Sequence, residues 1–163
     1  MNTTTHTAEE IRTATAKHLD HLISICKDGE AGYRAATDDT KDLELKSLFT
    51  RLARQRGDFA AELQLYVQRL GVEPCDSTSV AGSVHRGWIG LKAVLTKDNS
   101  HAVLAECERG EDSAVAAYRE VLADAPLESA HRLVVSTQSV AVQAAHDEIR
   151  ALRDHPAYSG KAA

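Results

Sequence analysis

The sequence is poor in proline, cysteine and aromatic residues, and it has no long apolar run. Its 163 residues include three prolines, three cysteines and 4% aromatic residues. Scarce prolines and aromatics in an alanine-rich chain favour packed helices over strands. Three widely spaced cysteines exclude a disulfide framework and a zinc-ligand spacing. No segment approaches the roughly 20 apolar residues of a transmembrane helix, so no membrane association is expected.

Positive charge is also scarce, because the formal net charge is −5 at pH 7. Nucleic acid is therefore not expected as a partner, since no basic stripe could neutralise phosphates. The first six residues, MNTTTH, lack the charged and apolar regions of a signal peptide. A cytoplasmic protein of one ordinary-sized domain is the expectation.

Four long stretches repeat apolar residues at spacings of three and four, which is the period of an amphipathic helix. They predict helices over residues 8–36, 42–70, 100–123 and 127–154. A shorter helix over 80–95 is expected inside the long connection between the second and third helices, which suits a crossover along the bundle. Together these elements predict one four-helix-bundle domain over 8–154, with a disordered N-terminus (1–7) and a flexible tail (155–163).

The four patterns also predict which face of each helix is buried. In the fourth helix the buried stripe is expected to contain Leu133, Val134, Thr137, Ala141, Ala144, Glu148 and Leu152. Leu65, Val67 and Val103 lie beside the main stripes of their helices. These three residues predict a second apolar face, which would be buried in a homodimer.

Charged residues fall on the buried stripes of two helices. Arg56 lies in the apolar series of the second helix, and Glu108 and Glu111 lie in that of the third. A buried charge requires a partner, and a guanidinium can hold carboxylates in a fork. We therefore expect Arg56 to pair with Glu108 or Glu111, with Glu30 of the first helix as a further acceptor.

Five segments resemble a known family. They are residues 25–33 (ICKDGEAGY), 43–63, 80–88 (VAGSVHRGW), 106–112 (ECERGED) and 146–150 (HDEIR). Over roughly residues 18–154 the chain resembles an uncharacterised bacterial family of ferritin-like four-helix bundles, known only as a domain of unknown function. The resemblance implies an all-α, ferritin-like bundle with a helix-containing crossover between helices two and three, and it implies no activity.

Ferritin-like di-iron sites need a glutamate from each of two helices and Glu-x-x-His from each of the other two. Glu128 and His131 form such a unit only at the first turn of the fourth helix, and in mid-helix Gln143 replaces the glutamate before His146. A standard di-iron site is therefore not expected. The alternative interpretation, a divergent iron or manganese site, would use Glu30, Glu62, Glu108, Glu111 and His146.

These observations favour a non-enzymatic structural or interaction protein without a cofactor, which acts by self-association as a homodimer or through a protein partner. Analogy with ferritin-like proteins would place it in a stress response. The alternative is a metal-binding protein or oxidoreductase built on the acidic residues above. The sequence leaves open whether the protein is an enzyme.

Overall fold

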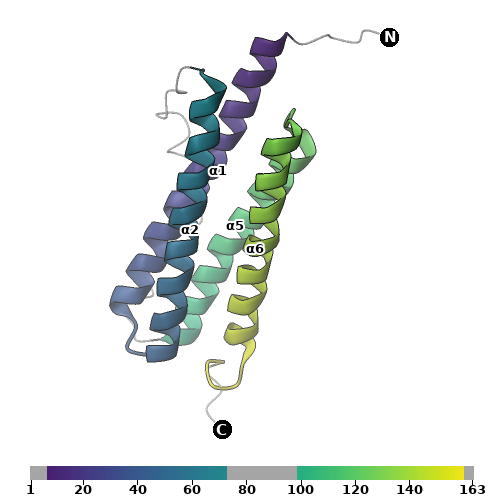
Figure 1. Cartoon of the computed structure of the whole chain (residues 1–163). Helices are drawn as coiled ribbons and strands as arrows, with labels where there is room; N and C mark the ends of the chain where they lie inside the picture. The colour runs from purple at the N-terminus through teal and green to yellow at the C-terminus, as the bar shows by residue number, and fades with distance from the viewer. Residues whose placement is uncertain (1–6, 73–98, 160–163) are drawn as a thin grey trace.

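The computed structural model describes residues 7–72 and 99–159, which form four long helices (Figure 1). They are α1 (Ala8–Asp39), α2 (Leu43–Leu70), α5 (Ser100–Asp124) and α6 (Ser129–Asp154). No strand occurs within these two ranges. The predicted all-α four-helix bundle is therefore confirmed. The crossover helix expected over 80–95 lies outside the described residues.

The bundle consists of two antiparallel hairpins side by side, α1 with α2 and α5 with α6 (Figure 1). The two hairpins meet mainly where α1 packs against α5, and the backbones of α2 and α6 approach each other less closely. α2 and α5 run in the same direction, although they follow one another among the described helices (Figure 1). None of the described helices combines the length and apolar character that a membrane span requires.

Local side-chain caps fix three of the helix beginnings. Thr7 accepts a hydrogen bond from the backbone N–H of Glu10, whose carboxylate accepts one from the N–H of Thr7, so a capping box starts α1. Asp42 caps α2 and Asn99 caps α5. At the end of α2, Gly71 adopts a left-handed backbone conformation with φ of 64°. Thr7 is thus part of the helix start, whereas the sequence assigned it to a disordered end.

The C-terminal tail also differs from its expectation. Residues 155–159 turn back on the bundle, and the Tyr158 hydroxyl donates a hydrogen bond to Oδ2 of Asp42 at 3.1 Å. The Tyr158 ring packs beside the buried residues at this end of the bundle. Residues 155–159, which the sequence assigned to a flexible tail, thus contact the bundle through a single aromatic residue.

Two apolar clusters make up the core. The first is built from the half of the bundle that holds the start of α1, and its larger members include Leu19, Leu22, Leu63, Tyr118 and Val135. The second fills the other half, and its larger members include Tyr33, Phe49, Leu52, Leu104 and Ile149. Along α2 and α5, Arg56 and Glu111 fall between the residues of the two clusters. The charged residues thus form a polar layer within an otherwise apolar core.

The predicted phase of α6 is wrong by about one residue. The helix buries His131, Val134, Val135, Gln138, Val142, Ala145 and Ile149. Leu133 is instead 68% exposed, and Thr137, Ala144 and Glu148 also face outward. The sequence carries apolar stripes on two sides of this helix, and the inner one is interrupted by His131 and Gln138. The expected stripe therefore followed Leu133, Thr137 and Ala144, each one residue before the buried positions Val134, Gln138 and Ala145.

Candidate functional site

The centre of the polar layer is an ion pair between Arg56 of α2 and Glu111 of α5. Each side chain is only 1% exposed, and Nη2 of Arg56 donates to Oε2 of Glu111 at 2.5 Å. The Tyr33 hydroxyl of α1 donates to the other carboxylate oxygen at 2.6 Å. Both oxygens of Glu111 therefore have a donor, while Nη1 of Arg56 is buried without a hydrogen-bond partner among the described residues.

Two glycines make room for charged side chains between α1 and α2. A Cβ atom added to Gly29 would lie 3.3 Å from Cγ of Arg56, so the arginine stem crosses α1 directly over this glycine. A Cβ atom added to Gly57 would lie 3.2 Å from the carboxylate of Glu30. Each helix thus offers a glycine to a charged residue of its neighbour, and the two helices can pack closely there.

The surroundings lock the protonation states of Arg56 and Tyr33. Burial by itself would lower the pKa of Arg56, but the charge of Glu111 and its hydrogen bond raise it above the ordinary arginine value. Burial, and then the charge of Glu111, raise the pKa of Tyr33 well above its ordinary value. Arg56 therefore stays charged and Tyr33 stays a hydroxyl donor near neutral pH, which suits a structural contact better than proton transfer.

A second chain of hydrogen bonds, buried except at its end on exposed Glu62, joins α1, α5, α6 and α2. The Tyr118 hydroxyl lies 3.2 Å from Sγ of Cys26 and donates to Oε1 of Gln138 at 2.7 Å. Nε2 of Gln138 donates to Glu62 at 2.8 Å. Burial raises the pKa of the Cys26 thiol, so Cys26 is not poised as a thiolate nucleophile.

Sequence reasoning missed the polar part that Tyr33, Tyr118, Cys26 and Gln138 take in this layer. The apolar spacing of the first and third predicted helices passes through the two tyrosines and the cysteine, which count there as apolar surface alone. Their hydroxyl and thiol groups, which need partners when buried, are a signal that could have drawn attention to the layer. Gln138 could not be found in the same way, because the phase of α6 was misjudged.

The structure separates the other residues expected in the ion-pair network. Glu108, which is 8% exposed, pairs with Arg153 of α6. Glu30 pairs with Arg34, one turn along α1, at 2.5 Å. Arg56 contacts neither carboxylate in any ion pair among the described residues, so the expected set of four reduces to Arg56 and Glu111, joined by Tyr33.

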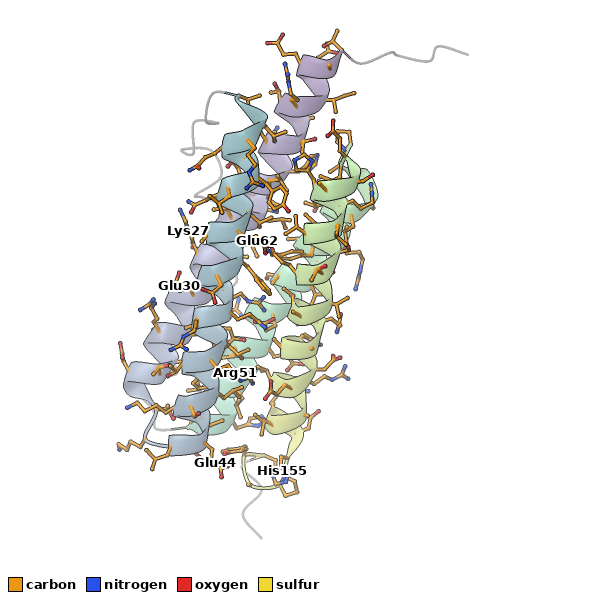
Figure 2. All side chains as sticks on the ribbon, in the orientation of Figure 1. Lys27, Glu30, Glu44, Arg51, Glu62 and His155 are labelled. Carbon is orange, nitrogen blue, oxygen red and sulfur yellow. The ribbon has the colours of Figure 1, made fainter. Side chains whose placement is uncertain are left out.

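The five residues of the alternative metal site do not converge either. Figure 2 shows Glu62 on the side of α2 that faces α6, where it accepts from Gln138. His146, with a side chain 12% exposed, lies between Asp112 and Asp147, at 2.9 Å from each. Glu30, Glu108 and Glu111 are held by three different arginines. No group of three histidine, cysteine or acidic side chains suited to a metal ion occurs among the described residues.

An open groove of about 600 Å³ lies between α1 and α2 on the outside of the bundle. Its charged lining alternates in sign and comprises Glu30, Arg34, Asp38, Arg54 and Asp58. The lining includes no histidine, cysteine or serine, and the hydroxyls of its two threonines, Thr37 and Thr50, donate to backbone carbonyls of their own helices. The groove therefore gives no support to a hydrolytic site.

The chain matches a known protein family. The family model described as Domain of unknown function (DUF2383) matches residues 14–124, which is more than half of the chain. The match covers α1 from Ala14 onward and the whole of α2 and α5, and so it includes Tyr33, Arg56 and Glu111. A search of curated proteins found no match to the chain.

Proposed function

This chain belongs to the DUF2383 family, and we propose that it is a non-enzymatic helical bundle that acts through its outer surface. The observation that carries this proposal is the closed state of the polar layer. Arg56 and Glu111 are each 1% exposed and engage one another. A substrate would have to displace packed helices to reach them.

The proposed role of the layer is to hold the four helices in one arrangement. A buried ion pair seldom adds net stability, because removing both charges from water costs about as much as their attraction returns. It does penalise any packing that separates the two charges. Arg56 comes from α2, Glu111 from α5 and Tyr33 from α1, so sliding any one of these helices would strand a charge or a hydroxyl.

Several finer predictions accompany this proposal. The parallel course of α2 and α5 supports a ferritin-like connectivity, in which one long connection joins the second and third helices of the bundle. A cytoplasmic location, the lack of a cofactor, a bacterial source and a role in stress remain predictions. The last of these depends on analogy with ferritin-like proteins alone.

Metal loading tests the proposal against its alternative. The protein would be incubated anaerobically with ferrous or manganous ion and desalted exhaustively, and the retained metal would be measured by mass spectrometry. We expect no stoichiometric retention in the wild type. Retention of about one or two ions per chain, lost in Glu111→Gln or Glu108→Gln, would overturn the proposal in favour of a divergent metalloprotein.

A further inference from the structure

The outer side of α6 carries a regularly spaced stripe of mainly small and apolar residues that the described part of the bundle leaves exposed. The outer stripe consists of Ala130, Leu133, Thr137, Val140, Ala144, Asp147 and Ala151, and each of these residues is exposed. Leu133 is 68% exposed and Val140 is 72% exposed. The spacing alternates between three and four residues without a break, which is the seven-residue repeat of helices that pack side by side.

The side chains by which α6 contacts α2 and α5 lie at positions of the helix outside the outer stripe. Gln138 and Glu148 bond to Glu62 and Arg51 of α2, and His146 bonds to Asp112 of α5. Figure 2 shows the two α2 residues on the side of that helix that faces α6. The outer stripe therefore points away from both neighbouring helices.

We propose that the outer stripe is the contact face for a second copy of this chain, in which the two α6 helices pack antiparallel about a twofold axis. The inference deepens the proposed function, since it names the first partner of the outer surface. It also moves the predicted dimer face, because Val103 is 6% exposed and Val67 packs against the core.

The order of residues along the outer stripe is self-complementary in the antiparallel arrangement. When α6 overlaps its copy over nearly its whole length, Leu133 faces Ala151 of the second copy and Val140 faces Ala144. Each large side chain thus meets a small one, as close helix packing requires. Thr137 faces Asp147 of the second copy, so the carboxylate meets a small side chain, whose own hydroxyl donates to the backbone carbonyl of Leu133. The twofold axis repeats each of these three matches, and Ala130 lies beyond them at the end of the stripe.

The same residues disfavour a parallel pair. In a parallel twofold arrangement each residue of the outer stripe would face its own copy. Asp147 would then oppose Asp147 in a partly desolvated contact, which is repulsive. Antiparallel packing separates these two charges, and it also places the two helix dipoles side by side in opposite directions, which is favourable. The acidic residue that interrupts the apolar stripe thereby selects the orientation of the partner.

The size of the face sets the strength of the association. The outer stripe spans 22 residues, or about 32 Å at a rise of about 1.5 Å per residue. A single helix pair of this length buries less than the roughly 1,200–2,000 Å² of a stable specific interface. The dimer is therefore weak, with a dissociation constant on the order of micromolar.

Sedimentation velocity of the full chain tests the association between about 5 and about 500 µM. We expect a concentration-dependent dimer whose dissociation constant rises at least about tenfold in Val140→Glu, because a charge enters its central layer. Leu65→Glu is the matched control, since Leu65 is 53% exposed on α2, outside the outer stripe. A wild type that stays monomeric, a dimer unchanged in Val140→Glu, or an equal loss in the control would each overturn the proposal.

Disulfide trapping tests the orientation in a Cys75→Ser background. Cys26 and Cys107 are buried, so the introduced thiols would react selectively. After mild oxidation with glutathione disulfide, a mixture of Val140→Cys and Ala144→Cys chains should form the mixed dimer in preference to either like pair. Preferential linkage of Val140→Cys with itself would indicate a parallel pair and overturn the proposal. Metal retention would overturn the proposed function without changing either readout, so the two failures are distinguishable.

Discussion

Replacing Arg56 by methionine should destabilise the bundle strongly, because it strands a buried charge. Methionine retains much of the apolar stem and removes the guanidinium, which leaves the Glu111 carboxylate with the Tyr33 hydroxyl as its one hydrogen-bond donor among the described residues. Both members of the pair are 1% exposed, so solvent cannot replace the lost partner. Breaking such a pair from one side typically costs about 3–5 kcal/mol.

The expected loss is large enough for simple assays. For a domain of this size each kcal/mol moves the melting temperature by about 2–4 °C, so Arg56→Met should melt about 6–20 °C below the wild type. Urea unfolding followed by circular dichroism would give the free energy directly. Glu111→Gln should also destabilise, since it leaves the guanidinium uncompensated. The double variant should cost clearly less than the sum of the two single losses, because it strands neither charge.

Arg51→Met is the matched control. Arg51 lies on the same helix and holds both oxygens of Glu148, at 2.7 and 2.6 Å. Its side chain is 54% exposed and that of Glu148 is 44% exposed, so the same substitution should cost no more than about 1 kcal/mol. Equal losses of unfolding free energy in Arg56→Met and Arg51→Met would refute the assignment of Arg56 and Glu111 as a desolvated pair. So would a loss in the Arg56→Met, Glu111→Gln double variant that equals the sum of the two single losses.

Three further predictions concern other contacts. Gly29→Ala should lower the free energy of unfolding by about 1–3 kcal/mol, because its Cβ presses on the buried stem of Arg56. Gly57→Ala should be neutral or stabilising, because its Cβ meets only the movable carboxylate of Glu30. Thermal melts of the two variants would compare them. Partial burial lowers the pKa of His146, but hydrogen bonds to its two aspartate partners raise it above its ordinary value. The stability from this contact is therefore full below about pH 6.5 and is lost as the pH rises through the higher folded value. His146→Gln should accordingly cost more in acid than in alkali by urea unfolding, and a pH-independent loss would contradict this. Tyr158→Phe removes the hydrogen bond to Asp42 and should lower the free energy of unfolding by about 0.5–1.5 kcal/mol in urea unfolding. A smaller loss would mean that the aromatic ring alone anchors the tail.

Where the sequence failed on α6, the failure has a physical origin. A helix with apolar residues on two sides has no unique buried face by periodicity. The expected stripe ran through Leu133, Thr137 and Ala144, whereas the buried face includes the polar residues His131 and Gln138. Gln138 can be buried because Tyr118 of α5 and Glu62 of α2 supply its hydrogen-bond partners. No count of apolar residues along α6 contains that information.

The site was foreseeable in part for a similar reason. Arg56 and Glu111 interrupt otherwise apolar stripes, so their burial and their need for a partner can be read from spacing. Which carboxylate meets the guanidinium depends on how α2 and α5 are set against each other. Glu108 lies one turn away from Glu111 and faces Arg153 of α6 instead, a choice that spacing on α5 cannot make.

The sequence by itself determined the local order of the chain. Its periodic apolar residues, its capping residues Asp42 and Asn99, and Gly71 define four long helices, because these signals act within a few residues of one another. Only the tertiary structure decided which charges pair, which face of α6 is buried and where the tail is anchored. Those outcomes depend on groups brought together from distant helices, and an individual helix is compatible with more than one of them.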